Sequence, residues 1–199
     1  MRAVFFDFGG VIQRTEYQAP RQHLGDRFGM DYEEMDKLVF ASQSARQASV
    51  GEITEDAHWS DVLKRLKRPA SELQMIKDEF FGGDVIDRDL VNFIRSLRGK
   101  IHTGLISNAW SGMRAFLEKE KFIELFDTVI ISAEAGMMKP DTGIYQIALE
   151  QAGVKAEQAV FVDDIQANID ASEKIGMKGI LFKDSQEALS RLKQLLKME

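Results

Sequence analysis

The chain has 199 residues but no cysteine and only three histidines. Without cysteine there can be no disulfide, no thiolate metal site and no cysteine nucleophile. The histidines, His23, His58 and His102, lie too far apart for a local metal-binding motif such as HExxH. A metal site built on thiolates is therefore excluded, and a site built on neighbouring histidines is not expected.

Long apolar runs and an excess of positive charge are also missing. No segment approaches the roughly 20 apolar residues that a transmembrane helix requires. Lys and Arg number 26 against 32 Asp and Glu, which gives a formal net charge of −6. An acidic surface disfavours non-specific binding to nucleic acid and docking on anionic lipid. We therefore expect no nucleic acid and no membrane among the partners, while the oligomeric state stays open.

The first residues, a cation followed by an apolar stretch, weakly resemble a signal peptide. Asp7 interrupts this stretch too early, however, and no small-residue cleavage site follows. We therefore expect a cytoplasmic protein whose first strand begins almost at once. Hydrophobic residues make up 44% of the chain and charged residues 29%, a balance that allows one buried core with a modest insertion.

Five short runs are nearly continuously apolar, which is typical of strands buried on both faces of a parallel sheet. They cover residues 3–8, 101–107, 128–132, 159–163 and 179–182. Helical patterns separate these runs: Asp87 can cap one helix, Pro140 suits the first turn of another, and a third stops at Gly176. This alternation predicts an α/β fold with a parallel, Rossmann-like sheet.

Residues 16–83 break the alternation, because they contain helical patterns but no convincing strand. In the last of these patterns, Ser71 followed by Gln74 forms a capping box, which predicts that the helix starts there. Two consecutive glycines then mark a flexible return. We expect residues 16–83 to form a helical cap, joined by two hinges to a core of residues 1–15 and 84–199.

Polar residues stand where the apolar runs end. Asp7 and Ser107 each close one run, and Asp163 and Asp164 close another. Ligands of open parallel sheets bind beyond the carboxyl ends of the strands, so these side chains are expected to converge on one crevice. Lys139 lies just before a predicted helix, and its ammonium group can reach the same crevice.

Such a crevice has a definite chemistry. Three carboxylates around one point repel one another, so at neutral pH they require a cation, a proton or both. Ligands that are all oxygen suit Mg²⁺. A lysine and a serine hydroxyl suit a phosphoryl group, because they oppose its charge and donate to its oxygens. One carboxylate is then free to attack phosphorus and to form an aspartyl-phosphate.

Four segments combine these polar residues with characteristic neighbours. They are FDFGGV at residues 6–11, LISN at 105–108, MKPD at 138–141 and FVDD at 161–164. In this order they resemble motifs I to IV of the haloacid dehalogenase-like (HAD) hydrolases, and the four together are far more specific than any one alone. The helical insertion resembles the cap of subfamily I. The branch that the chain resembles most holds sugar-1-phosphate phosphatases and the phosphatase domain of soluble epoxide hydrolases.

The resemblance implies a Mg²⁺-dependent phosphomonoester hydrolase that acts on a small phosphorylated metabolite, such as a sugar phosphate. Its nucleophile would be Asp7. The implied metal ligands are Asp7, the carbonyl of Gly9, Asp163 and Asp164. The groups that would hold or neutralise the phosphate are Ser107, Asn108 and Lys139. Lys139 would also neutralise Asp7, which makes these two the catalytic pair.

Gly9 departs from the family pattern. In typical phosphatases of this family a second aspartate stands there and acts as general acid on the leaving group. Such help is typically worth about 10²–10⁴-fold, and glycine cannot give it. Either another group supplies the proton, or good leaving groups such as an anomeric sugar hydroxyl are preferred, or hydrolysis is slow. His23 and His58 of the cap are the candidates for a replacement acid.

Two other functions stay open. A 2-haloacid dehalogenase also uses an aspartate nucleophile on this fold, but it has no need of the further acids Asp163 and Asp164. The missing acid at Gly9 also allows a non-catalytic protein that binds a phosphorylated metabolite or another protein. Tyr145 and Asn168 are expected to brace the site rather than react in it. The cap candidates for substrate contact are Arg21, Arg46 and Gln47.

Overall fold

A five-stranded parallel sheet forms the centre of the computed structural model, which describes residues 1–198. The strands are β1 (Ala3–Phe6), β4 (His102–Ser107), β5 (Thr128–Ile131), β6 (Ala159–Asp163) and β7 (Lys178–Leu181). Their order is β5-β4-β1-β6-β7, and every neighbouring pair is parallel. Each strand overlaps one of the predicted apolar runs, so the predicted α/β fold with a parallel sheet is confirmed.

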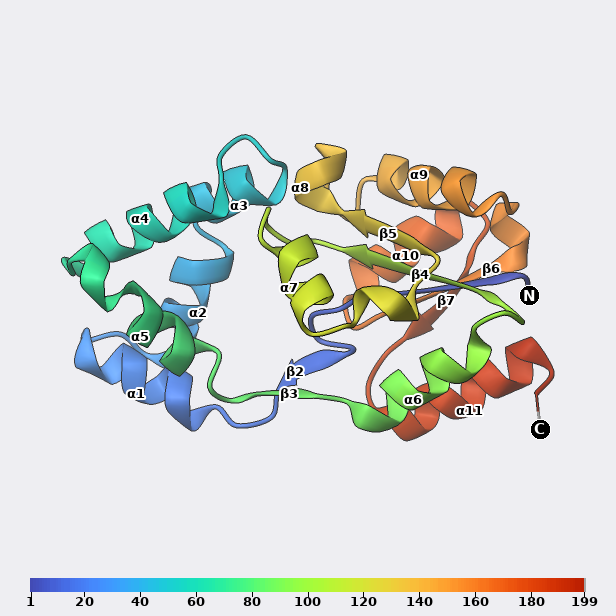
Figure 1. Ribbon diagram of the computed structural model, residues 1–199, viewed down its shortest axis with the longest axis horizontal. Helices are drawn as coiled ribbons and strands as arrows, with labels where there is room; N and C mark the ends of the chain where they lie inside the picture. The colour runs from blue at the N-terminus through green and yellow to red at the C-terminus, as the bar shows by residue number, and fades with distance from the viewer. Residues whose placement is uncertain (199) are drawn as a thin grey trace.

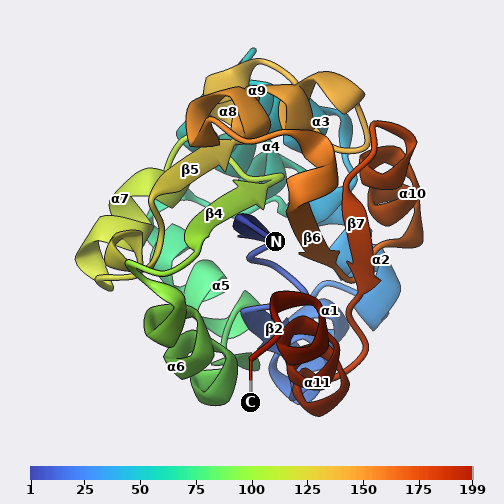
Figure 2. The ribbon, with the colours of Figure 1, turned by 90° about the vertical axis from the view of Figure 1, so that its right-hand side faces the viewer.

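Helices cover both faces of the sheet, because side chains alternate in direction along each strand. On β1, Val4 and Phe6 join the hydrophobic cluster of one face, and Phe5 joins that of the other. The first face is covered by α6 (Arg88–Leu97), α7 (Met113–Lys119) and α11 (Ser185–Leu196). The second is covered by α9 (Thr142–Ala152) and α10 (Gln166–Lys174). Figure 2 shows α6 and α11 on one side of the sheet and α9 and α10 on the other.

Two short strands and a group of helices follow β1. The strands β2 (Gln13–Thr15) and β3 (Asp84–Ile86) pair antiparallel at the two places where the sequence predicts only hinges. Each strand has three residues, none of them buried, so neither shows the apolar run that predicts a strand. Five helices lie between them: α1 (Ala19–Arg27), α2 (Tyr32–Phe40), α3 (Gln43–Ser49), α4 (Glu55–Leu66) and α5 (Leu73–Phe80). We call residues 16–83 the helical insert. It buries a hydrophobic cluster of its own around Trp59 and lies beside the sheet in Figure 1.

Two predicted helix starts are wrong. Ser71 does not begin α5, because it lies in the 3₁₀ turn η1 (Ala70–Glu72), and the helix starts at Leu73 without a side-chain cap. Pro140 does not lie in α9. The carboxylate of Asp141 accepts a hydrogen bond of 2.8 Å from the backbone N–H of Gly143. Asp141 is therefore the N-cap, and α9 begins at the next residue, Thr142.

Three short turns complete the described chain: η2 (Ile123–Leu125), α8 (Ser132–Ala135) and η3 (Ala156–Gln158). Within residues 1–198, no helix combines the length and the apolar character that a bilayer span requires.

Polar contacts at Asp84 tie the helical insert to its connecting strands. The carboxylate accepts hydrogen bonds from Gln13 Nε2 at 3.0 Å and from Thr15 Oγ1 at 2.7 Å. The guanidinium of Arg21, in α1, lies 3.4 Å from the same carboxylate and 2.5 Å from that of Asp36. Since Arg21 is only 3% exposed, its charge depends on these partners rather than on water.

We expect Asp84→Ala to lower the free energy of unfolding by about 2–4 kcal/mol, because it removes a partner from a buried charge and leaves two donors unpaired. Glu33→Ala is the matched control: Glu33 pairs with Lys37 at the surface, 3.1 Å apart, and its loss should cost at most about 0.5 kcal/mol. Urea unfolding followed by circular dichroism measures both values. Equal losses in the two variants would contradict this account of Asp84.

Candidate active site

Two carboxylates and one ammonium group meet at the carboxyl ends of the central strands. Asp7 follows β1, and Asp163 ends β6, its neighbour in the sheet. Lys139 Nζ lies 2.8 Å from Asp7 Oδ2 and 2.7 Å from Asp163 Oδ2. All three residues are buried, with Asp7 the most accessible at 7%. The structure thus brings together three residues that the sequence assigns to one crevice.

Lys139 is fixed in this place through its backbone. Its N–H donates to Asn108 Oδ1 at 2.8 Å, and its carbonyl accepts from Asn108 Nδ2 at 2.9 Å. Asn108 directly follows the last residue of β4, so the loop after this strand holds the segment that carries the lysine. The ammonium group also lies over the ring of Phe161, 5.4 Å from its centre. Lys139 therefore cannot move away from the carboxylates without breaking these contacts.

Asp163 is oriented by hydrogen bonds to both of its oxygens. The backbone N–H of Ile165 donates to Oδ1 at 2.8 Å, and Asn168 Nδ2 lies 3.0 and 3.1 Å from Oδ1 and Oδ2. The hydroxyl of Tyr145 donates to the carbonyl of Asn168 at 2.9 Å. Asn168 thus supports Asp163 directly, and Tyr145 supports Asn168, in keeping with the bracing role expected of them from the sequence.

Asp164 adds a third carboxylate. One oxygen from each of Asp7, Asp163 and Asp164 lies within 4.8 Å of the others. The oxygens of Asp163 are engaged by Lys139 and Asn168, whereas Asp164 is exposed and forms no ion pair within residues 1–198. A donor set made of oxygen alone fits a hard divalent cation such as Mg²⁺. Asp7 is engaged as well, because its Oδ1 accepts the N–H of Phe8 at 2.7 Å and its Oδ2 faces Lys139, so Asp164 has the freest oxygens.

The charges of this cluster do not balance. Burial raises the pKa of Asp7 to about 7; Lys139 opposes this shift, and the negative charge of Asp163 adds to it. The pKa of Asp164 is also raised, by its partial burial and by the charge of Asp163. One ammonium group is therefore too little for three carboxylates, and a proton or a cation is needed.

The end of β4 and the loop after β1 complete the crevice. Ser107, the last residue of β4, is 3% exposed on the strand next to β1. At Gly9 no heavy atom lies within 4 Å of the position that a Cβ would take, and the backbone is outside the left-handed region. Gly10 has a φ of +77°, and a Cβ there would collide with the carboxylate of Asp164. The loop therefore requires glycine at position 10 but not at position 9.

The candidates for substrate contact in the helical insert lie in different surroundings. The guanidinium of Arg21 is occupied by Asp36 and Asp84, so it serves the connection to the core. Sequence reasoning could not show this, because these partners lie 15 and 63 residues away along the chain. Arg46 is exposed and Gln47 half-buried, both on α3.

The two histidines of the insert differ as well. His58 is completely buried, its Nδ1 lies 2.9 Å from Ser44 Oγ, and burial lowers its pKa. Its ring packs 4.5 Å from that of Trp110, centre to centre. A neutral imidazole enclosed in this way does not suit proton transfer to a substrate. His23 is exposed on α1.

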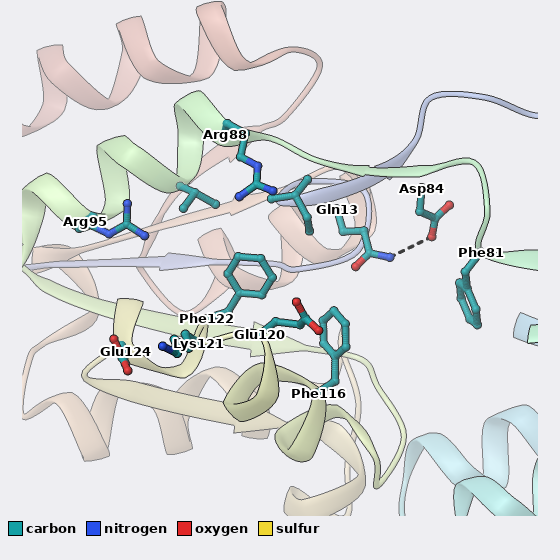
Figure 3. Close-up of a pocket in the computed structure, with 12 residues that line it drawn as sticks. Gln13, Phe81, Asp84, Arg88, Arg95, Phe116, Glu120, Lys121, Phe122 and Glu124 are labelled. Carbon is teal, nitrogen blue, oxygen red and sulfur yellow. Dashed lines mark hydrogen bonds between the residues drawn. The ribbon is translucent and has the colours of Figure 1, made fainter. Parts of the chain in front are cut away.

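A cavity of about 510 Å³ lies beside the connecting strands (Figure 3). Gln13 and Phe81 line it on the side of the insert, and Phe116 and Phe122 line it on the side of the core. Phe122 packs in the same hydrophobic cluster as Phe6 of β1, on the face of the sheet opposite to Phe5. No residue of the acidic cluster lines this cavity, so it is separate from the crevice.

The raised pKa of Asp7 generates a prediction about stability. The folded protein holds this proton more tightly than the unfolded chain does, so without metal the contribution of Asp7 to stability falls as pH rises from about 4 to about 7. Asp7→Asn removes the buried charge and should raise the melting temperature of metal-free protein at pH 8 by several degrees, at about 2–4 °C per kcal/mol. Scanning calorimetry with EDTA measures this shift. Glu150→Gln, at an exposed position of α9, is the control; an Asp7→Asn protein that melts below wild type would contradict the expected penalty.

Comparisons with a family model, with related sequences and with solved structures agree on one family. A family model described as haloacid dehalogenase-like hydrolase matches residues 4–182. A sesquiterpene phosphatase from Aspergillus oryzae is 26% identical over 201 residues, which cover 98% of this chain and 96% of that protein. A phosphorylated carbohydrates phosphatase from Thermotoga maritima is 24% identical over 187 residues, which cover 90% of this chain and 84% of that protein.

Among solved structures, a HAD family enzyme from Bacteroides thetaiotaomicron, in complex with magnesium and inorganic phosphate, has the same fold. The TM-score is 0.80 at 18% identity, and the match covers 95% of this chain and 98% of that one. The segment that matches the family model spans nearly the whole chain and contains the entire acidic cluster. This chain therefore belongs to the haloacid dehalogenase-like hydrolase family.

Proposed function

We propose that this HAD hydrolase is a Mg²⁺-dependent phosphomonoesterase whose nucleophile is Asp7. The observation that carries the proposal is the contact of buried Lys139 with the carboxylates of Asp7 and Asp163, beside a third carboxylate. This arrangement offers a nucleophile, a counter-charge for phosphate and oxygen ligands for a cation in one place. The magnesium and phosphate in the Bacteroides thetaiotaomicron structure support the same ligand chemistry here.

The residues present fit a magnesium ion. We assign Asp7 and Asp164 as metal ligands, because one oxygen of each lies within 4.8 Å of the other, and the carbonyl of Gly9 because it stands at the ligand position of the first motif. Asp163 belongs to the same group of carboxylates, but its hydrogen bonds to Lys139 and Asn168 give it a second task, the orientation of the lysine. When bound, Mg²⁺ supplies positive charge that balances the carboxylates and the phosphoryl oxygens.

The reaction follows from the position of Asp7. Its carboxylate oxygen attacks phosphorus, the bond between phosphorus and the alcohol oxygen breaks, and the alcohol leaves with a proton taken from water. A second water then attacks the phosphorus of the aspartyl-phosphate, which releases inorganic phosphate and restores the carboxylate. Lys139 reduces the repulsion between Asp7 and the phosphate. The Ser107 hydroxyl and the Asn108 backbone donate to the phosphoryl oxygens.

The glycine at position 9 favours substrates that need no protonation of the leaving group. An anomeric sugar hydroxyl is a better leaving group than an ordinary alcohol, so a sugar 1-phosphate fits this site. The relative from Thermotoga maritima, which is named for phosphorylated carbohydrates, supports this substrate class. We therefore propose a small phosphorylated metabolite, esterified through an acidic hydroxyl, as the substrate.

The wild-type protein should hydrolyse para-nitrophenyl phosphate with Mg²⁺ and lose this activity in EDTA, since the carboxylates need the cation. Asp7→Asn should fold but show only background turnover, because an amide has no anionic oxygen for attack on phosphorus. Steady-state assays with Glu150→Gln as the control measure both effects. Metal-independent halide release from a 2-haloacid would favour a dehalogenase, and phosphate binding without turnover would favour a binding protein. Near-normal activity of folded Asp7→Asn would end the proposal of a covalent route.

The empty space at Gly9 leads to a second test. Gly9→Asp should fit the loop and restore a general acid, so the hydrolysis of esters with poor leaving groups should rise by up to about 10²–10⁴-fold. Gly10→Asp is the matched control. The backbone at position 10 is left-handed and the carboxylate of Asp164 occupies the space for a side chain, so this variant should lose activity. The measurement is kcat/KM for aryl, sugar 1- and sugar 6-phosphates, plotted against leaving-group pKa. A flat wild-type plot would mean that an acid other than residue 9 already acts.

A further inference from the structure

Trp110 belongs to the core by sequence but packs into the hydrophobic cluster of the helical insert. It lies in the loop between β4 and α7, which extends toward the insert in Figure 1. Its ring stacks on Phe40, 5.9 Å between centres at 30° between planes, and lies 4.5 Å from His58 and 5.9 Å from Trp59. Among residues 1–198 it is the one member of this cluster that does not come from the insert.

The same loop is bonded to the catalytic lysine. Two residues before Trp110, the side chain of Asn108 holds the N–H and the carbonyl of Lys139 at 2.8 and 2.9 Å. Between them, the N–H of Ala109 donates to Ser132 Oγ at 3.0 Å, and Ser132 Oγ lies 3.2 Å from the Ala109 carbonyl. Only Ala109 stands between Trp110 and Asn108, so the two ends of the loop belong to one short, hydrogen-bonded segment.

We propose that Trp110 is a positioning residue: the packing of the helical insert on its ring holds Asn108, and through Asn108 it holds Lys139 against Asp7. The catalytic meaning of this link rests on the proposed function. Ser111 gives the loop a second contact with the insert, because its Oγ accepts the backbone N–H of Glu55 at 3.2 Å. An error of about 1 Å in a catalytic group can lower a rate on the order of 10²-fold, so a small release of this loop matters.

This link differs from the two strands that tether the insert. β2 and β3 connect it to the loop that follows Asp7, whereas the Trp110 loop follows the end of β4, the strand next to β1 in the sheet. The insert thus reaches the core at two separate places. When the insert is seated on Trp110, Lys139 is fixed by Asn108 in the geometry described above. When the insert moves away, the loop loses the packing that holds Asn108.

Hydrogen exchange measures this link without any reference to activity. In Trp110→Ala the amide of Lys139, which donates to Asn108, should exchange about tenfold faster or more, because its acceptor is released. The amide of Phe182, which donates to the carbonyl of Asp163, should not change and so reports whether the core as a whole is destabilised. Trp110→Phe keeps a stacking ring and should restore the wild-type rate. Phe81→Leu, a ring loss within the same cluster, is the matched control and should leave Lys139 unaffected, because the ring of Phe81 pairs with Trp59 and Phe80 rather than with Trp110.

Kinetics with para-nitrophenyl phosphate and Mg²⁺ complete the test. Trp110→Ala should lower kcat by about 10–100-fold with little change in KM, and Trp110→Phe should recover most of the loss. An unchanged Lys139 amide in Trp110→Ala overturns the proposal, and so does faster exchange accompanied by a rise in KM alone. If wild type shows no Mg²⁺-dependent turnover, the proposed function fails, and the exchange rates still decide whether Trp110 holds Lys139.

Discussion

The ammonium group of Lys139 lies in a buried space between carboxylates that belong to two neighbouring strands. Taking such charges out of water is costly, and their attraction offsets the cost only while the distances are kept. The sheet sets one of these distances, because neighbouring strands lie about 4.7–4.9 Å apart. The other contacts serve the same end: Asn108 fixes the backbone of the lysine, while Asn168 and the hydroxyl of Tyr145 fix Asp163. The architecture around the crevice follows from this one buried contact.

The same contact leaves the negative charge of the three carboxylates only partly neutralised. A single lysine beside three carboxylates leaves surplus negative charge, and burial together with the charge of Asp163 raises the pKa values of Asp7 and Asp164. A site that were neutral by itself would have no need of a cation and little attraction for one. Under the proposed function, this excess acid would weaken the metal-free protein and favour a divalent ion, an instance of stability given up at a functional site.

The sequence predicts the features that depend on local pattern. Apolar runs locate the five strands, the polar residues at their ends locate the crevice, and the motifs assign the family. Contacts between distant segments are not readable in this way. Arg21 looks like a substrate ligand until its distant acidic partners are known, and Trp110 looks like one more aromatic core residue. Gly9 and Gly10 are indistinguishable as letters, because only their backbone angles and neighbours separate a required glycine from a replaceable one.

The division between core and insert suggests how one chemistry can serve different alcohols. The insert has its own hydrophobic cluster, so its surface can change without disturbing the carboxylates, which stand on the sheet. The freedom is limited at the places where insert and core are bonded: the connecting strands around Asp84 and the loop around Trp110. Under the proposal for Trp110, a substitution in its loop affects Lys139 through Asn108 although it touches no substrate. Substrate specificity can therefore change through residues on the free faces of the insert, whereas the residues at its contacts with the core are constrained.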